Sequence, residues 1–215
     1  MPLRTRIKIC GLTQEADVDA AVEAGADAIG LVFYPRSPRY VTLQRAEALT
    51  RRLAPFMTPV GLFVNADEET VRAACDAIPH LVLQFHGDET PQACEQYGRP
   101  YLRAARMTAE FDLLHFAARY ASAQALLLDA HVEGYGGGGK AFDWSLIPPS
   151  VPRPVVLSGG LTPANVIGGI LQVRPWAVDV SSGVESARGI KDAVAIRRFC
   201  EAVREADARD ASAGA

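Results

Sequence analysis

Eight short apolar runs, rich in β-branched residues and leucine, recur along this chain of 215 residues. Most of the runs are apolar at nearly every position instead of alternating between apolar and polar residues, which is typical of parallel strands covered on both faces. Each run therefore predicts one strand of a parallel sheet. The predicted strands span residues 6–9, 28–32, 59–63, 81–85, 101–104, 125–128, 155–158 and 177–180.

Segments with the spacing of amphipathic helices lie between the predicted strands. Threonines stand directly before several of these segments, where a side-chain oxygen can cap the first turn. We expect such caps at Thr13, Thr42, Thr90 and Thr162. The predicted helices span residues 14–24, 43–53, 69–77, 91–97, 110–120, 164–171 and 192–205, with a shorter candidate at 144–147.

Eight strand–helix units in 215 residues leave about 27 residues for each, which fits a compact (β/α)8 TIM barrel. The alternative is a doubly wound open sheet, which usually has fewer strands and a glycine-rich first turn. Here the first turn reads Cys10-Gly11-Leu12-Thr13 and lacks that glycine pattern. We predict an α/β protein with a (β/α)8 barrel as a single domain over residues 1–206, followed by a disordered tail at 207–215.

Charge and composition exclude several kinds of partner. Lys and Arg number 22 against 25 Asp and Glu, a formal net charge of −3, so the chain lacks the basic excess that duplex nucleic acid requires. We expect no signal peptide and no membrane span. The four cysteines form no CxxC pair and no zinc-like spacing with the histidines. We therefore expect a cytoplasmic protein with reduced thiols, without metal, membrane or nucleic acid.

The first predicted strand leads into Cys10, and chemistry in such barrels belongs at the C-terminal ends of the strands. A cysteine is more often a small buried apolar residue than a reactive one. Gly11 leaves room above it, however, and Lys8 faces the same side by strand alternation. A cation there would lower the pKa of the thiol. Cys10 is therefore a candidate general base, with Lys8 as a candidate pocket residue.

The sixth predicted strand leads from four apolar residues into Asp129. A helix cap or a loop hydrogen bond is the structural interpretation of such an aspartate. The functional interpretation is a carboxylic acid, because desolvation raises the pKa of a buried carboxyl and lets it donate a proton. Cys10 and Asp129 together form an acid–base pair of the kind that isomerisation requires. The glycine run at residues 134–140 follows, and we expect it to form a mobile cover.

Glycine-containing turns follow the seventh and eighth predicted strands, each beside an expected helix start. Exposed backbone N–H groups in such turns suit a phosphate. The loops after strands 7 and 8 also form the common phosphate site of these barrels. The sequence therefore predicts a phosphorylated small molecule as ligand, held by Gly159, Gly160, Ser181, Ser182 and Gly183.

Two further side chains are candidates for the pocket. Arg36 and Arg39 stand beside Pro35 and Pro38 after the second strand, and arginines in such a loop are usually solvated. The two prolines restrict the backbone and could turn one of these guanidinium groups inward, where it would suit a carboxylate, which it binds through parallel hydrogen bonds. His86 ends the fourth strand. It lines the pocket or serves as a structural imidazole, and the sequence alone leaves both interpretations open.

Ordered motifs along nearly the whole chain resemble phosphoribosylanthranilate isomerase, a family of tryptophan biosynthesis. The motifs that carry this resemblance are Lys8–Thr13, Gly30–Phe33, Ser37–Arg39, Gly61–Asn65, Gln84–Glu89, Leu128-Asp129, Gly137–Trp144, Ser158–Leu161 and Asp179–Glu185. The resemblance implies an Amadori rearrangement of N-(5′-phosphoribosyl)anthranilate without a cofactor or a metal.

The resemblance also implies roles for individual residues. Cys10 matches the general base of the family, Asp129 the general acid and Arg39 the residue that holds the anthranilate carboxylate, while the glycine loops match the phosphate site. The implied partner is a phosphosugar substrate. We expect a monomer, since the alanine-rich helices show no clear apolar patch.

Other functions remain open at this point. A pentose-phosphate epimerase would require a His/Asp metal cluster at the strand ends, and an indole-glycerol-phosphate synthase would require catalytic lysines there. Neither pattern is present in the sequence. A non-catalytic phosphate-binding barrel would keep the glycine loops, but it would not need both Cys10 and Asp129.

Overall fold

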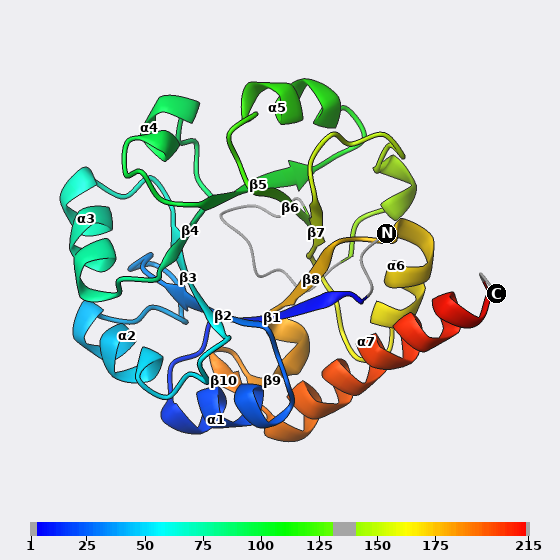
Figure 1. The fold of residues 1–215 in the computed structure, drawn as a ribbon, viewed down its shortest axis with the longest axis horizontal. Coiled ribbons are helices and arrows are strands. Elements are labelled where there is room, and N and C mark those ends of the chain that lie inside the picture. Colours follow the sequence, from blue (N-terminus) through cyan, green and yellow to red (C-terminus); the bar gives the residue numbers. More distant parts are fainter. Residues whose placement is uncertain (1–3, 131–140, 214–215) are drawn as a thin grey trace.

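The structure, a computed structural model, describes residues 4–130 and 141–213. Eight parallel strands follow one another around a closed barrel, and β1 pairs with both β2 and β8. The helices lie outside this barrel (Figure 1). The strands are β1 (Arg6–Cys10), β2 (Ala28–Val32), β3 (Thr58–Phe63), β4 (Val82–Phe85), β5 (Tyr101–Met107), β6 (Ala125–Ala130), β7 (Val155–Leu157) and β8 (Ala177–Val180). The predicted (β/α)8 barrel is confirmed.

Helices follow most of the strands at the predicted places. Between β6 and β7, the described residues contain only the short 3-10 helix η1 (Trp144–Leu146). A second such helix, η2 (Ser182–Val184), follows β8. The α-helices are α1 (Glu15–Glu23), α2 (Leu43–Thr50), α3 (Glu68–Ala77), α4 (Pro91–Glu95), α5 (Leu113–Arg119), α6 (Val166–Val173) and α7 (Ala193–Ala213). None of these described helices is long and apolar enough to cross a bilayer.

The strands are apolar on both faces because each face is buried against a different layer. Ile7 and Ile9 of β1 belong to a large cluster that includes helix residues such as Val71 and Phe199. A second, smaller cluster fills the barrel itself and includes Leu102 and Leu127. Successive side chains of a strand point to opposite faces, so cluster membership tells which residues of each strand face the barrel interior.

Two of the four predicted helix caps are confirmed. The side-chain oxygens of Thr42 and Thr90 accept hydrogen bonds from the third residue beyond them, at the starts of α2 and α4. Thr13 does not cap α1, because the helix begins only at Glu15 and its N-cap is Gln14, which forms a capping box with Asp17. Thr162 is not a cap either: residues 162–165 form a turn first, so that α6 begins only at Val166.

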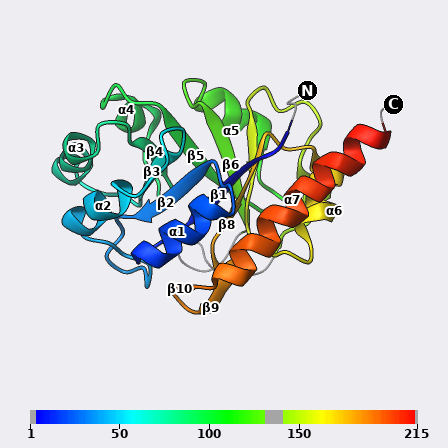
Figure 2. The ribbon, with the colours of Figure 1, turned by 60° about the horizontal axis from the view of Figure 1, so that its bottom comes forward.

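The C-terminal segment differs from the prediction, since α7 continues through residues 207–213 instead of ending at 205. The reason is tertiary. Asp207 accepts hydrogen bonds from the backbone N–H and the hydroxyl of Thr5, at 2.9 and 2.6 Å, and Asp210 pairs with Arg174. The two ends of the described chain therefore lie close together, far from the unpredicted β9–β10 hairpin (Glu185–Ala187, Ile190–Lys191) that precedes α7 (Figure 2).

Candidate active site

Polar side chains face the barrel interior just beyond its apolar filling, towards the C-terminal ends of the strands. Leu127 of β6 and Ala177 of β8 belong to the interior cluster. Asp129 and Asp179 lie two residues further along the same strands and therefore face the same way. Both are buried, with 8% and 5% of their surface exposed. Buried carboxylates require partners. Asp179 finds them on β1 and in the loop after β7, whereas Asp129 lies beside His86, which follows β4.

Cys10 lies at the end of β1 and faces the barrel interior, because Ile9 belongs to the outer cluster. Gly30 of β2 is its register partner. A Cβ atom on Gly30 would lie 2.5 Å from Cys10 Sγ, so only glycine leaves room for the thiol. Gly30 is thus a residue of the site that the sequence did not single out, although it stands in one of the recognised motifs.

Lys8 also faces inward, but its charge is already engaged. Its Nζ donates a 2.7 Å hydrogen bond to Asp179 Oδ1, and Ser158 Oγ donates to the other oxygen of Asp179. Lys8 acts on Cys10 in the expected direction, but burial is the larger effect. Burial therefore raises the pKa of the Cys10 thiol above its ordinary value, and Lys8 and Lys191 oppose it only in part.

Asp129 lies within β6 and contacts two groups. Its Oδ1 accepts from the backbone N–H of Ala130 at 2.9 Å, and its Oδ2 lies 3.2 Å from His86 Nε2, without the alignment of a hydrogen bond. The amide nitrogen of Gln84 lies 3.3 Å from the other ring nitrogen, Nδ1. When Gln84 donates there, the neutral imidazole carries its proton on the nitrogen that faces Asp129. The structure thus places His86 directly beside Asp129.

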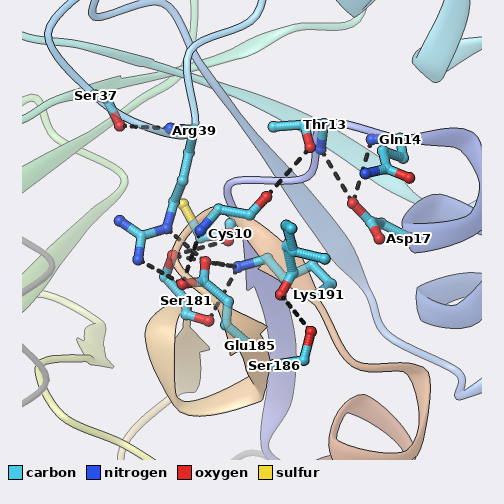
Figure 3. A network of polar contacts seen from close by, with 12 residues as sticks. Cys10, Thr13, Gln14, Asp17, Ser37, Arg39, Ser181, Glu185, Ser186 and Lys191 are labelled. Carbon is cyan, nitrogen blue, oxygen red and sulfur yellow. Dashed lines mark hydrogen bonds and ion pairs between the residues drawn. The ribbon is translucent and has the colours of Figure 1, made fainter.

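Arg39 crosses the barrel mouth next to Cys10. A Cβ atom on Gly11 would lie 2.4 Å from Arg39 Cδ, so the side chain passes directly over Gly11. The Ser37 hydroxyl accepts from the backbone N–H of Arg39. The guanidinium is bound on one edge by Glu185, with Nε–Oε1 and Nη2–Oε2 distances of 2.6 and 2.8 Å (Figure 3).

Lys191 and Glu185 complete a polar network that sequence reasoning missed. Lys191 Nζ donates to Glu185 Oε1 at 2.8 Å and to the Ser181 carbonyl at 3.0 Å, and Ser181 Oγ donates to the Cys10 carbonyl (Figure 3). Glu185 closes the last recognised motif, which was a usable signal. Lys191 had no comparable signal in the sequence, because the β9–β10 hairpin, which was not predicted, brings this residue to Glu185.

The loops after β7 and β8, which contain the predicted phosphate-binding residues, touch each other. A Cβ atom on Gly183 would lie 1.9 Å from the Leu161 carbonyl oxygen, and Gly159 has a φ of 75° beside Asp129. Both positions therefore require glycine. Across the described residues, no hydrogen bond engages the backbone N–H of Gly159, Gly160, Ser182 or Gly183. The expected cover at 134–140 lies outside the described residues.

A closed parallel barrel with inward-facing thiol, carboxyl, imidazole and guanidinium groups at its C-terminal strand ends defines a TIM-barrel enzyme. Comparison with known proteins refines this class. A family model described as N-(5′-phosphoribosyl)anthranilate (PRA) isomerase matches residues 7–202. The chain belongs to this family.

Relatives and solved structures agree with that assignment. N-(5′-phosphoribosyl)anthranilate isomerase of Leptothrix cholodnii is 76% identical over 215 residues, which cover 99% of this chain and 98% of the relative. The enzyme of Methylibium petroleiphilum is 73% identical, with 98% and 99% covered. The crystal structure of phosphoribosyl anthranilate isomerase from Thermotoga maritima has a TM-score of 0.87 at 40% identity, with 94% and 99% covered. A crystal structure of phosphoribosyl anthranilate isomerase in complex with reduced 1-(o-carboxyphenylamino)-1-deoxyribulose 5-phosphate has a TM-score of 0.83 at 38% identity, with 94% of this chain and 99% of that chain covered.

Proposed function

We propose that this protein converts N-(5′-phosphoribosyl)anthranilate to 1-(2-carboxyphenylamino)-1-deoxyribulose 5-phosphate, an Amadori rearrangement in tryptophan biosynthesis. The observation that carries the proposal is the inward-facing pair of Cys10 and Asp129, at the C-terminal strand ends of a chain that belongs to this isomerase family. The rearrangement requires one acid and one base, and these two side chains supply both.

Asp129 is the general acid of the first step. In its acid form, it donates a proton to the oxygen of the furanose ring, the bond between this oxygen and C1′ breaks, and the nitrogen lone pair forms the protonated imine. His86 lies 3.2 Å from the carboxyl group, close enough to contact it in the pocket. The contact supports a pocket role for His86 over a purely structural one.

Cys10 is the general base of the second step. Its thiolate removes the proton from C2′, and the electrons of that bond move through C1′ to the imine nitrogen, giving an enolamine. Protonation of C1′ and loss of the hydroxyl proton at C2′ complete the ketone. The protonated imine is itself the electron sink, so the proposed chemistry proceeds with protein acid and base groups alone.

The two anionic ends of the substrate have separate binding groups in this proposal. The unengaged backbone N–H groups of the loops after β7 and β8 suit the phosphate. Arg39, buried beside Cys10, suits the anthranilate carboxylate. Lys8 remains a pocket residue whose partner is Asp179.

The decisive measurement is the decay of substrate fluorescence, recorded when the purified protein is added to freshly made N-(5′-phosphoribosyl)anthranilate. We expect catalysed decay, and we expect the gene to restore growth of a tryptophan auxotroph that lacks the isomerase. A barrel that only binds phosphate would fail both measurements.

We propose further that residues 1–206, together with the remainder of α7, form one domain. We also propose that the chain acts as a cytoplasmic monomer on a phosphosugar, without nucleic acid or membrane. All four cysteines are free thiols, which supports a reducing compartment. The large exposed apolar residues, such as Phe56 and Trp176, are spread over separate segments, which supports a monomer.

Light scattering of the purified protein tests the oligomeric state. We expect a molecular mass near 23.0 kDa, and twice that mass would contradict the monomer.

A further inference from the structure

The Arg39–Glu185 contact fixes which edge of the guanidinium is occupied. On one side of the guanidinium, Nε and Nη2 each donate a hydrogen bond to one of the two carboxylate oxygens of Glu185. A guanidinium has five N–H donors in a rigid plane, so the edge formed by Nη1 and the second hydrogen of Nη2 remains for another acceptor. Nη1 points away from Glu185 (Figure 3). That edge can bind one carboxylate through two parallel hydrogen bonds.

Glu185 is itself held firmly. Lys191 Nζ donates to its Oε1 at 2.8 Å, the backbone N–H of Gly189 reaches Oε2 at 3.3 Å, and its side chain is only 5% exposed. Burial acts to raise the pKa of Glu185, but the contacts with Arg39 and Lys191 outweigh it and hold the pKa below its ordinary value. The anchor is therefore a carboxylate under ordinary conditions, and it is buried.

Among the residues that the structure describes, Glu185 is the only one that accepts hydrogen bonds from the Arg39 guanidinium. Its side chain is 9% exposed and lies flat over Gly11, which offers no side chain to pack against. The loop that carries it lies 146 residues from Glu185 in the chain. Without the anchor, the long side chain would regain its rotamer freedom, and a ligand would have to order it on binding.

We propose that Glu185 is a positioning residue that turns the Nη1/Nη2 edge of Arg39 towards the substrate carboxylate, and so sets the preference for carboxylated substrates. This inference rests on the proposed function. It assigns Glu185 no contact with the reacting atoms, so its removal should affect carboxylate recognition much more than turnover at saturating substrate.

The test uses two stable ligands, the reduced product analogue and the same molecule without its carboxyl group. Dissociation constants are measured for the wild type, Glu185→Gln, Arg39→Ala and the double variant. The Gln side chain keeps the shape of Glu185 but presents an N–H to one guanidinium donor. Glu15→Gln is the matched control, because Glu15 also binds an arginine, Arg45, through both oxygens, between α1 and α2 and outside the site.

We expect Glu185→Gln to weaken the carboxylated ligand about tenfold or more, the range for one charge-assisted contact, and to leave the other ligand nearly unchanged. In the Arg39→Ala background, the same change should have no further effect on either ligand. KM should rise while kcat at saturation does not fall by more than about threefold, since Glu185 contacts neither the acid nor the base. Lys191, released from Glu185, would favour the Cys10 thiolate and so would not lower kcat. Glu15→Gln should behave as the wild type.

Equal weakening of both ligands, or additive effects in the double variant, would overturn the inference. Tighter binding of the carboxylated ligand by Glu185→Gln would show that Glu185 competes with substrate, which would also overturn it. If Glu185→Gln does not fold, Glu185→Asp keeps the charge but shortens the reach, and it should weaken only the carboxylated ligand. A wild type that binds neither ligand would instead contradict the proposed function.

Discussion

Cys10 lies in surroundings that disfavour its reactive form. Burial raises the pKa of its thiol, and the two nearby ammonium groups, Lys8 and Lys191, are each bound to a carboxylate. A cation neutralised by its own partner stabilises a third group less than a free cation does. The thiolate is therefore the minor form near neutral pH, and turnover should depend on how often it is formed.

This environment predicts the pH dependence of the reaction. A base acts in its deprotonated form, so a raised pKa moves the rising limb of the profile to higher pH. We expect kcat/KM to keep rising beyond about pH 8.5, the ordinary pKa of a cysteine. Stopped-flow fluorescence over neutral to alkaline pH measures it. A plateau already reached at neutral pH would mean that the thiol is not the base, or that its pKa is lowered.

Loss of either reacting group should reduce turnover by a large factor. We expect Cys10→Ser and Asp129→Asn each to lower kcat by roughly 10²–10⁴-fold, the usual contribution of general acid–base groups. Cys75→Ser is the control: Cys75 is a buried thiol of α3, outside the barrel interior, and its kcat should remain normal. Near-normal kcat for a folded Cys10 or Asp129 variant would reject the role of that residue.

At the scale of the strands, β2 shapes the space for the thiol of β1. Gly30 pairs with Cys10 in register, and the missing side chain is what admits Sγ. The same principle applies where β6 meets the β7 loop, since a Cβ atom on Gly159 would lie 2.4 Å from the Ala130 nitrogen. Close approach of neighbouring backbones thus decides where the acid and the base can sit.

Gly30→Ala tests this element directly. The new methyl group would meet Cys10 Sγ at 2.5 Å, so we expect kcat to fall by about 10²-fold through misplacement of the base and stability to drop by about 1–3 kcal/mol through overpacking. Gly168→Ala in α6 is the matched control, because its Cβ atom would be 4.0 Å from the nearest atom outside the helix, in Trp144. It should leave kcat unchanged. Equal kcat for the two variants would contradict the spacing argument.

At the scale of the whole molecule, the two ends of the described chain fasten the barrel where β1 meets β8. Thr5 precedes β1 and is 5% exposed, and both of its hydrogen bonds go to Asp207 of α7, 202 residues away. The contact closes the outer layer where the first strand meets the last helix. It lies at the N-terminal ends of the strands, away from Cys10 and Asp129.

Asp207→Ala should therefore reduce stability without affecting catalysis. Two donors of buried Thr5 would lose their acceptor, which costs about 1–3 kcal/mol and appears as a lower midpoint in urea unfolding. Asp210→Ala, which removes the exposed pair with Arg174, should cost at most about 1 kcal/mol. Equal losses for both variants, or a lower kcat for Asp207→Ala, would contradict this account of the closure.

Much of the fold could be predicted because it depends on local pattern. The apolar runs placed all eight strands, and alternation along β1 put Lys8 and Cys10 on one face. Thr42 and Thr90 cap their helices because a cap needs only the next three residues. Thr162 failed as a cap, since Asn165 binds the backbone there and delays the helix.

The sequence by itself determined the barrel, the strand ends at which chemistry belongs, and the identity of the acid, base and guanidinium candidates. Only the tertiary structure decided which polar side chains pair with each other. Lys8 pairs with Asp179, Arg39 with Glu185, and Asp207 with Thr5, and the two residues of each pair are more than a hundred residues apart in the chain. The physical reason is that residue type and periodicity are local properties. Burial and the pairing of charges, which set the pKa of Cys10 and the open edge of Arg39, exist only once distant strands and loops meet.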